Sequence, residues 1–387
     1  MNRHHEQIRH AWVEIDLAAI RHNLQEIKRM VGPAVDIMAV VKAEAYGHGA
    51  IPVAKAAIAS GARWLGVAMP EEGIQLRKAG IETPILIFGP IQPDQVGPVI
   101  QYDLTTAICN WESAVAMSGE AVKTAKPALV HLKVDTGMGR VGVQPDDAVD
   151  FMRKITRLPG LQVTGIFSHM ATADEKDKNY ARHQIQIFSA VVADLKKVGL
   201  LPEKVHLANS AGIMELPESH FNMVRPGIIL YGLYPSNEVD RKKALFKPAL
   251  ALKVRVTFVK KVPAGSGISY GQRYHTKKES TVATIPIGYA DGWSRLLTNK
   301  AEAMIKGKKY PIVGTICMDQ CMIDLGDDTV EIGQEVVLIG ESGKEKISAD
   351  SLAEKMGTIN YEITCMLSNR LPRVYLNSEG LENREEP

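Results

Sequence analysis

One lysine of this 387-residue chain stands where it could act as a nucleophile. Lys42 directly follows the apolar run 37–41, which predicts a buried strand. An amine at the end of such a strand is poorly hydrated, and poor hydration favours the neutral form that attacks a carbonyl carbon. A lone lysine at a strand end usually extends into solvent, but here Tyr46 follows closely, and Gly47 and Gly49 let the backbone turn tightly. We therefore predict a Schiff-base lysine, with the Tyr46 phenol beside it to bind a phosphate or a proton.

The residues around Arg225 predict a phosphate site. Pro226 and Gly227 follow Arg225 and can begin a short helix, and helix N-termini commonly bind phosphate. We predict that the main-chain N–H groups of Gly227 and Ile228 and the hydroxyl of Ser210 are phosphate ligands. Arg225 itself, flanked by proline and glycine at a strand end, is predicted to face the ligand rather than to form a surface ion pair.

Eight strand-like runs alternate with helix-like stretches in the first 240 residues. This alternation predicts an α/β fold, a (β/α)8 TIM-like barrel, whose active site lies at the carboxyl ends of the strands. Polar residues follow those ends, so one composite pocket is expected. The predicted strands cover residues 35–41, 64–68, 85–88, 104–107, 128–134, 162–168, 204–208 and 222–224, and helix-like stretches include 17–31, 50–60, 70–79 and 179–199. The polar residues are Lys42, Arg140, His169, Asn209, Ser210 and Arg225.

A different pattern begins near residue 241. Short β-branched runs separated by Gly, Asp or Lys predict a mainly antiparallel β-domain over 241–387, joined to the barrel domain (1–240) through the polar linker 235–248. The run 11–15 could pair with either domain, and the acidic tail 379–387 is predicted to be disordered. The predicted strands of the β-domain cover residues 249–262, 280–287, 301–306, 309–317, 320–325 and 334–340.

Composition narrows the functional classes. Hydrophobic residues make up 45% and charged residues 23% of the chain, as in ordinary soluble enzymes. The net charge of +2 gives no reason to expect a nucleic-acid partner, and no apolar stretch approaches the roughly 20 residues that span a bilayer. The four cysteines lack the spacing of a zinc site, so no metal is predicted. No signal peptide is recognised, and a cytoplasmic protein with reduced thiols is expected.

Motifs along most of the chain, from residue 12 to about 376, resemble those of the alanine racemase family. In order they are VVKAEAYGHG (40–49), HLKVDTGMGRVG (131–142), FSHMATADE (167–175), ANSAG (208–212), VRPGIILYG (224–232), SGISYGQRY (266–274), IGYADGW (287–293), GTICMDQ (314–320) and INYEI (359–363). The resemblance implies a barrel-plus-β-domain fold, pyridoxal 5'-phosphate on Lys42, and a homodimer with shared active sites. It also implies an isomerase that interconverts L-alanine and D-alanine and supplies D-alanine for peptidoglycan synthesis.

The same resemblance implies a role for each site residue. Arg225 would contact the pyridine nitrogen of the cofactor, and His169 would hold Arg225 in place. Arg140 would contact the phenolic oxygen of the cofactor and the substrate carboxylate. Tyr270 would be the second base and the main-chain N–H of Met318 would bind the substrate carboxylate, both supplied by the partner subunit. The implied phosphate ligands are Tyr46, Ser210, Gly227, Ile228 and Tyr361.

Two opposed bases explain racemisation, because a proton must leave one face of Cα and another must return to the opposite face. Lys42 would serve one face and Tyr270 the other, through a pyridoxal-phosphate aldimine. A tyrosine can do this only if cations stabilise its phenolate, and Arg225, acting through His169, is the expected source. An arginine only donates hydrogen bonds, so the pyridine nitrogen stays unprotonated and the ring is a weaker electron sink than with a carboxylate partner. Proton return to Cα is then favoured over transamination.

Several residues have open or minor roles. Lys133 lies on the fifth predicted strand and matches a lysine that some family members carry as a carbamate; an ordinary ion-paired lysine is the alternative. The family usually has Asn or Asp at position 44 and often Arg at position 315, where this chain has Glu44 and Thr315. We assign Glu44 no role, and the change at Thr315 puts a local interface contact in doubt. The histidines predicted to pack at strand or turn ends, without binding a ligand, are His48, His131 and His206.

Two other functions fit parts of the sequence. A pyridoxal-phosphate decarboxylase of basic amino acids would share the barrel and the β-domain, but Arg225 disfavours the strong electron sink that decarboxylation uses. A non-enzymatic pyridoxal-phosphate carrier with the same barrel would end near residue 235. The residues beyond that point, which include Tyr270 and Met318, argue against a carrier.

Overall fold

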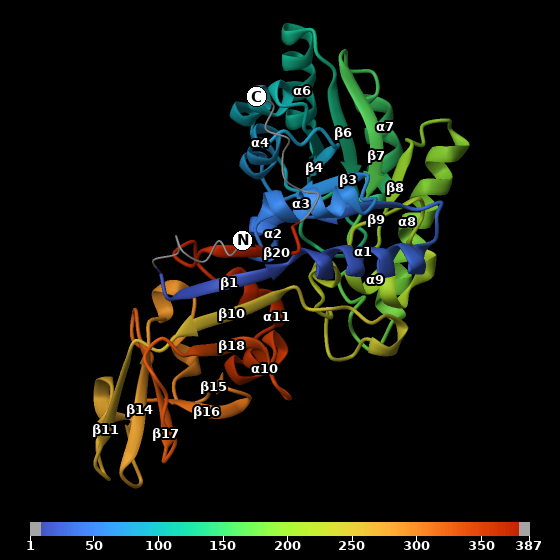
Figure 1. Cartoon of the computed structure of the whole chain (residues 1–387). Coiled ribbons are helices and arrows are strands. Elements are labelled where there is room, and N and C mark those ends of the chain that lie inside the picture. Colours follow the sequence, from blue (N-terminus) through green and yellow to red (C-terminus); the bar gives the residue numbers. More distant parts are fainter. Residues whose placement is uncertain (1–8, 379–387) are drawn as a thin grey trace. The chain divides into compact units, whose positions relative to one another are not determined.

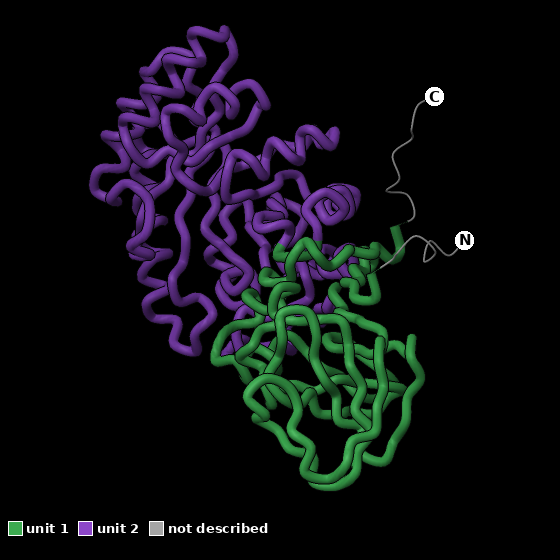
Figure 2. Tube along the Cα trace, turned by 90° about the vertical axis from the view of Figure 1, so that its left-hand side faces the viewer, with its two compact units in different colours: residues 1–18, 46–48, 249–380 green, residues 19–45, 49–248, 381–387 purple. Residues whose placement is uncertain are grey.

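The computed structural model describes residues 9–378, so the predicted disordered tail 379–387 lies outside the described residues. The chain divides into two compact units (Figure 2). The β unit comprises the described parts of residues 1–18, 46–48 and 249–380, and the barrel unit comprises residues 19–45 and 49–248. The division therefore falls a few residues after the predicted boundary at 240, and the first strand lies in the β unit.

The barrel unit contains a closed barrel of eight parallel strands (Figure 1). Each strand pairs in parallel with the next, and β9 pairs again with β2 to close the ring. The predicted (β/α)8 barrel is confirmed, and the predicted strands closely match the observed ones. These are β2 (Asp36–Val40), β3 (Trp64–Val67), β4 (Ile85–Ile87), β5 (Thr105–Ile108), β6 (Ala128–Lys133), β7 (Leu161–Phe167), β8 (Lys204–His206) and β9 (Met223–Val224).

Helices alternate with the barrel strands along the chain, and their apolar stripes explain why they pack inward. In α1, Ile20, Leu24 and Ile27 are fully buried and recur every three or four residues, which places them on one helix face. None of the helices within residues 9–378 is long and apolar enough to cross a membrane. The helices are α1 (Leu17–Val31), α2 (Lys42–Tyr46), α3 (Ala50–Ala59), α4 (Pro70–Lys78), α5 (Val96–Gln101), α6 (Trp111–Thr124), α7 (Ala148–Ile155), α8 (Asn179–Lys197) and α9 (Ser210–Glu215).

Side chains fill the inside of the barrel. An apolar cluster there consists of Met38, Leu86, Ala107, Phe167 and Met223. Two histidines, His131 on β6 and His206 on β8, are completely buried beside this cluster, and the Phe167 ring stacks on the His206 ring at a centroid distance of 4.8 Å. The barrel core is therefore apolar, but it encloses imidazole groups close to the strand ends where the site was predicted.

The β unit is built on one large sheet in the order β11-β14-β17-β16-β15-β18-β10-β1-β20, with β19 paired to β18. All pairings in this sheet are antiparallel except that of β1 with β20. The strands are β1 (Ala11–Asp16), β10 (Leu250–Arg255), β11 (Phe258–Val262), β14 (Ser280–Ile285), β15 (Glu302–Ile305), β16 (Lys308–Val313), β17 (Cys321–Gly326), β18 (Glu335–Ser342), β19 (Glu345–Ile347) and β20 (Arg373–Leu376). The pair β12 (Gly267–Ile268) and β13 (Tyr274–His275) and the helices α10 (Ala349–Met356) and α11 (Asn360–Cys365) complete the unit.

The predicted single strand 249–262 is wrong in one respect, because two strands occupy it. β10 pairs with β1 and β18, whereas β11 pairs with β14. Between them the main-chain N–H of Val256 donates to Gln334 and that of Thr257 donates to Thr284. The chain stays extended while its hydrogen-bond partners change, so the break leaves no mark in the β-branched sequence.

Candidate active site

A left-handed turn presents Lys42 at the end of β2. In Lys42–Tyr46 (α2), the four residues after Lys42 all have φ between 51° and 55°. Such values cost a non-glycine residue roughly 1–2 kcal/mol each, and strain of this kind concentrates at functional sites. The turn begins in residues other than glycine, and Gly47 (φ 85°) and Gly49 (φ 93°) continue it in the conformation expected of glycines.

Carboxylates stabilise this turn within the barrel unit. Glu72 accepts a 2.6 Å hydrogen bond from the main-chain N–H of Ala43. Glu44 accepts hydrogen bonds from the main-chain N–H of Ala50 at 3.2 Å and from the side chain of Gln75 at 3.0 Å. Glu44, whose role was open, is thus a structural residue that ties the turn to α3 and α4.

Arg225 follows β9 and is only 4% exposed. Its Nη1 donates to Nδ1 of His206 at 2.7 Å, and its Nη2 donates to the main-chain oxygens of Ser168 (2.7 Å) and Leu207 (2.9 Å). Nη2 also lies 3.4 Å from Nδ1 of His169. Burial lowers the pKa of Arg225 to about 9, so the guanidinium stays charged at neutral pH. Neutral acceptors alone hold this cation, and its Nε–H donates to no residue in the described part of the chain.

The contact of His206 with Arg225 is one that the sequence analysis missed, because His206 was assigned to packing. Its contact with Arg225 is shorter than that of His169, the residue predicted to hold the guanidinium. The strand register contains the signal. His206 pairs with Met223 across β8 and β9, and Arg225 comes two residues after Met223. Residues two apart along an extended chain share one face, so the long side chain of Arg225 can reach His206.

The His169 ring lies within the electrostatic influence of four positively charged side chains of the barrel unit. Burial and the surrounding positive charges lower the pKa of His169 well below its ordinary value, so the imidazole is neutral. These charges come from Arg225, Lys133, Arg140 and Lys42. A site with such an excess of positive charge suits a ligand that carries phosphate or carboxylate groups.

Lys133, at the end of β6, is 7% exposed, and its Nζ lies 4.2 Å from the centroid of the Phe167 ring. Burial and then the charge of Arg225 lower the pKa of Lys133 well below its ordinary value. No carboxylate among residues 9–378 lies within 4.0 Å of its ammonium group. The alternative of an ion-paired lysine therefore has no partner in the described chain.

The predicted phosphate ligands of the barrel unit converge at Ser210. This residue begins α9, is 4% exposed, and accepts hydrogen bonds at its Oγ from the main-chain N–H of Gly227 (2.9 Å) and of Ile229 (3.5 Å). Ile228 begins the short 3-10 helix Ile228–Tyr231 (η5) directly after Gly227. A hydroxyl and several main-chain N–H groups thus lie together at the ends of two helices, which is a common arrangement for binding phosphate.

The loop that carries His169, here called the β7 loop (residues 169–178), is held by a buried amide. Gln184 on α8 is completely buried. Its Oε1 accepts from the main-chain N–H of Ala171 at 2.8 Å, and its Nε2 donates to the main-chain oxygen of His169 at 3.1 Å. Gln184 therefore fixes the backbone on both sides of the first turn of this loop.

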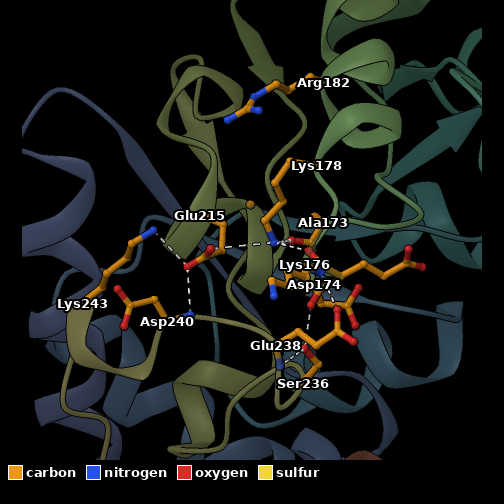
Figure 3. Close-up of polar contacts among 12 residues, drawn as sticks. Ala173, Asp174, Lys176, Lys178, Arg182, Glu215, Ser236, Glu238, Asp240 and Lys243 are labelled. Carbon is orange, nitrogen blue, oxygen red and sulfur yellow. Dashed lines mark hydrogen bonds and ion pairs between the residues drawn. The ribbon is translucent and has the colours of Figure 1, made fainter.

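A nearly buried carboxylate fastens the other end of the β7 loop (Figure 3). Glu215, at the end of α9, accepts from Nζ of Lys243 at 3.0 Å and from the main-chain N–H of Asp240 at 3.3 Å, and lies 3.7 Å from Nζ of Lys178. The side chains of Glu215 and Lys178 are 11% and 12% exposed. Lys178 also donates to the main-chain oxygen of Ala173 at 2.9 Å. One carboxylate thus joins the β7 loop to the segment that follows the barrel.

A second set of contacts joins the same two segments. Ser236 Oγ donates to the main-chain oxygen of Asp174 at 2.6 Å, and Glu238 accepts from the main-chain N–H of Lys176. The main-chain N–H of Glu238 in turn donates to Ser236 Oγ at 3.1 Å. Figure 3 shows these contacts beside those of Glu215, and the two sets join the same two segments of the chain. The β7 loop and the segment 236–243 should therefore move together or not at all.

Replacing Glu215 with glutamine should loosen the β7 loop, because Lys178 and Lys243 would lose their shared anion while the side-chain volume stays the same. We expect amide hydrogen exchange in residues 173–178 and 236–243 to speed up by about tenfold while the barrel strands stay protected. The matched control is Glu218→Gln, since Glu218 pairs with Arg182 at 3.5 Å while about half exposed. Unchanged exchange in the β7 loop of Glu215→Gln would show that the network does not hold the loop.

Four further predicted residues lie in the β unit. Tyr270 and Met318 are 73% and 53% exposed. The rings of Tyr46 and Tyr361 lie 6.0 Å apart between centroids, and Tyr46 is 8% exposed. Burial raises the pKa of Tyr46, so its phenol remains a hydrogen-bond donor. The β unit therefore brings two predicted phosphate ligands together and leaves the predicted second base open to a partner.

Thr315 acquires a role that the sequence analysis did not foresee. It is 1% exposed, and its hydroxyl donates to the main-chain oxygen of Tyr270 at 2.7 Å. The hydroxyl of Ser269, which has φ 66°, donates to the main-chain oxygen of Thr315 at 2.6 Å. These two hydrogen bonds fix the backbone that presents Tyr270.

Comparison with known proteins gives one consistent result across both units. Residues 15–235 match the family model for the alanine racemase N-terminal domain, and residues 249–375 match that for the alanine racemase C-terminal domain. An alanine racemase of Desulforamulus reducens is 48% identical over 367 residues, which cover 94% of this chain and 98% of that relative. A solved structure of an alanine racemase from Clostridium difficile 630 has a TM-score of 0.92 and 40% identity, and the match covers 96% of this chain and 97% of that chain.

A solved histidine racemase from Leuconostoc mesenteroides subsp. sake is also similar, with a TM-score of 0.90 and 31% identity over 96% of this chain and 99% of that chain. The relatives thus include a racemase of a second amino acid, but they share one fold over nearly their whole length. With both domain models matched and a relative 48% identical over most of its length, this chain belongs to the alanine racemase family and is an isomerase.

Proposed function

We propose that this protein is an alanine racemase that interconverts L-alanine and D-alanine with pyridoxal 5'-phosphate. The observation that carries this proposal is Arg225, a buried guanidinium held by neutral acceptors, with Nε–H making no hydrogen bond to a described residue. A carboxylate here would keep a pyridine nitrogen protonated, whereas a guanidinium can only donate to it. The weaker electron sink that results favours returning a proton to Cα, which is what a racemase must do.

The residues of the barrel unit fit this cofactor. Four cations act on His169, and no carboxylate in the described residues contacts Arg225 or Lys133. Pyridoxal phosphate and an amino acid bring a phosphate, a phenolic oxygen and a carboxylate, which would balance this charge. The main-chain nitrogen of Gly227 and Oγ of Ser210 lie 2.9 Å apart. The N–H of Gly227 and the hydroxyl of Ser210 would donate to the phosphate from two helix ends.

When bound, pyridoxal phosphate would supply a ring that accepts electron density from Cα. Lys42 would hold the cofactor and move a proton at one face of Cα, and Tyr270 from the partner subunit would move a proton at the other face. Arg140 and the main-chain N–H of Met318 would orient the substrate carboxylate. Arg225 would donate to the pyridine nitrogen. The residues that would hold the phosphate are Tyr46, Ser210, Gly227, Ile228 and Tyr361.

We infer that the protein works as a homodimer in which the β unit of one chain supplies Tyr270 and Met318 to the barrel unit of the other. The exposure of both side chains supports this, because an exposed Tyr270 and an exposed Met318 are accessible to a second chain. Thr315 also supports it, since it rigidifies the backbone of an otherwise exposed Tyr270. An exposed tyrosine with a fixed backbone is suited to a pocket on another chain.

Lys133 is proposed to carry a carbamate. Its burial and low pKa favour the neutral amine, and only a neutral amine reacts with carbon dioxide. The carbamate anion would then neutralise part of the charge of Arg225 and Arg140, which both act on Lys133. Mass spectrometry of the intact protein at high and low bicarbonate would detect the added group.

The cellular role follows from the proposed product. D-alanine would enter peptidoglycan synthesis, so we propose that the enzyme supplies a cell-wall precursor. The reaction would take place in the cytoplasm, where free L-alanine and pyridoxal phosphate are available.

Incubating the purified protein with pyridoxal phosphate and L-alanine should bring the optical rotation to zero without releasing carbon dioxide. The same assay with L-lysine tests for a decarboxylase of basic amino acids, and L-histidine tests for the substrate named for one structural relative. Racemisation of L-alanine at least tenfold faster than that of L-histidine is expected. Release of carbon dioxide, or faster racemisation of L-histidine, would contradict the proposed substrate.

A further inference from the structure

A hydrogen-bonded chain of three residues extends from Arg225 into the barrel core. Nη1 of Arg225 lies 2.7 Å from Nδ1 of His206, and Nε2 of His206 lies 2.9 Å from Nδ1 of His131. Both histidines are completely buried. His131 comes from β6 and His206 from β8, and β7 separates these strands in the barrel. His131 therefore reaches across the barrel to a residue that touches the site.

The donors and acceptors of this chain can be assigned in only one way. A guanidinium only donates, so Nδ1 of His206 must accept and cannot carry a proton. The single proton of His206 is then on Nε2, and it must be donated to His131. Nδ1 of His131 accepts this proton, which places the proton of His131 on its own Nε2. Each imidazole is neutral and has its proton on Nε2.

The hydrogen-bonded chain ends at His131, and the surroundings of His131 hold its ring in place. His131 Nε2 has no hydrogen-bond partner within residues 9–378, so the chain ends there. The His131 ring lies 5.2 Å from the Trp64 ring and 6.4 Å from the Phe167 ring between centroids. A Cβ on Gly165, the residue paired with His131 on β7, would lie 2.6 Å from the imidazole. Aromatic packing thus holds the ring in place, and the ring fits there because residue 165 is a glycine and has no side chain.

The orphaned N–H at the end of the chain costs free energy, since burying an unpaired donor is unfavourable. Burial also lowers the pKa of His131 to about 3, so the ring is neutral and its Nδ1 is available as an acceptor at neutral pH. A phenylalanine would fill the same space without an unpaired N–H. Compared with phenylalanine, a histidine adds one useful atom here, Nδ1, which accepts the hydrogen bond from His206.

We propose that His131 is a positioning residue that fixes the tautomer of His206 and thereby keeps Nδ1 of His206 as the acceptor for Arg225. Arg225 favours the tautomer of His206 with its proton on Nε2, but without His131 that buried N–H has no acceptor, so the tautomer protonated on Nδ1 gains population. A proton on Nδ1 would face the Arg225 guanidinium, donor against donor, and would turn that side chain away. Only the last step, from Arg225 to the reaction, rests on the proposed function.

The tautomers can be measured directly in the cofactor-free protein by 15N-detected NMR with labelled histidine. The wild-type protein should show both His131 and His206 with a protonated Nε2 and a bare Nδ1. In His131→Leu, the His206 signals should shift toward a mixture that includes the Nδ1-protonated form. In His131→Asn, Oδ1 occupies the place of Nδ1 and still accepts, so His206 should keep the wild-type tautomer.

The wild-type spectrum alone can overturn the inference, so the test survives a variant that fails to fold. Protonated Nδ1 on either histidine, or an unchanged His206 tautomer in a folded His131→Leu protein, would refute it. With the cofactor added, racemisation should fall about tenfold or more in His131→Leu and recover to within about threefold of wild type in His131→Asn. Failure of the proposed function would abolish turnover in all three proteins but would leave the tautomers as predicted.

Discussion

Replacing Lys42 with alanine should abolish both the covalent attachment of pyridoxal phosphate and nearly all racemisation. The left-handed turn places this amine after β2, and no other lysine of the described barrel unit follows a strand in such a turn. A positioned acid–base group contributes about 10²–10⁴-fold, and losing covalent attachment adds to that, so turnover should fall by more than about 10³-fold. Borohydride reduction followed by peptide mapping of the wild-type protein should recover the cofactor on Lys42.

The matched control is Lys78→Ala, which removes an exposed lysine at the end of α4 and should leave turnover unchanged. Recovery of the reduced adduct on another lysine, or substantial activity of Lys42→Ala, would refute the assignment. Lys42→Ala leaves the carboxylate contacts of the turn in place, so we expect the variant to lose activity without losing its fold.

Replacing Tyr270 with phenylalanine should reduce racemisation by about 10²–10⁴-fold, because a general base would be lost from one face of Cα. Proton abstraction from L-alanine should suffer most, while exchange of the Cα proton of D-alanine should partly survive through Lys42. Tyr310→Phe is the control, since the Tyr310 hydroxyl donates to Asp328 elsewhere in the β unit at 2.8 Å. Equal losses for both enantiomers would mean that Tyr270 positions the substrate and moves no proton.

Mixing the two inactive proteins tests whether the site is shared. In a dimer of Lys42→Ala with Tyr270→Phe, one of the two sites would receive both intact residues. Random exchange makes about half of the dimers mixed, so about one quarter of the wild-type activity should return. If subunit exchange is demonstrated and no activity returns, each site is built from one chain alone.

The barrel was predictable because its strands are buried on both faces. Short apolar runs such as 37–41 and 128–134 therefore indicate strands, and the polar residue after each run marks the mouth of the barrel. That rule is enough to locate Lys42 and Arg225 from the sequence alone. The sequence also contains signals for α10, since Ser348 accepts from the N–H of Ser351 and Gly357 ends the helix with φ 75°.

The contacts between residues far apart in the sequence were not predictable in the same way. His206 was assigned to packing because a lone buried histidine usually packs, and only the register of β8 and β9 shows that it meets Arg225. Glu215 carries no motif at all, and its role comes from the convergence of Lys178 and Lys243 on one carboxylate. The left-handed turn after Lys42 was missed because its residues are not those that normally adopt positive φ.

The most direct test of the two-base racemase is the fate of the Cα hydrogen in deuterium oxide. The purified protein with pyridoxal phosphate would be given L-alanine, and both enantiomers would be separated and analysed by mass spectrometry at low conversion. Two opposed bases predict that the new D-alanine carries deuterium at Cα while the remaining L-alanine keeps its hydrogen, because the returning proton comes from a group in exchange with solvent. D-alanine that retains the original hydrogen would show that one base carries the proton between faces, and no D-alanine at all would contradict the proposed function.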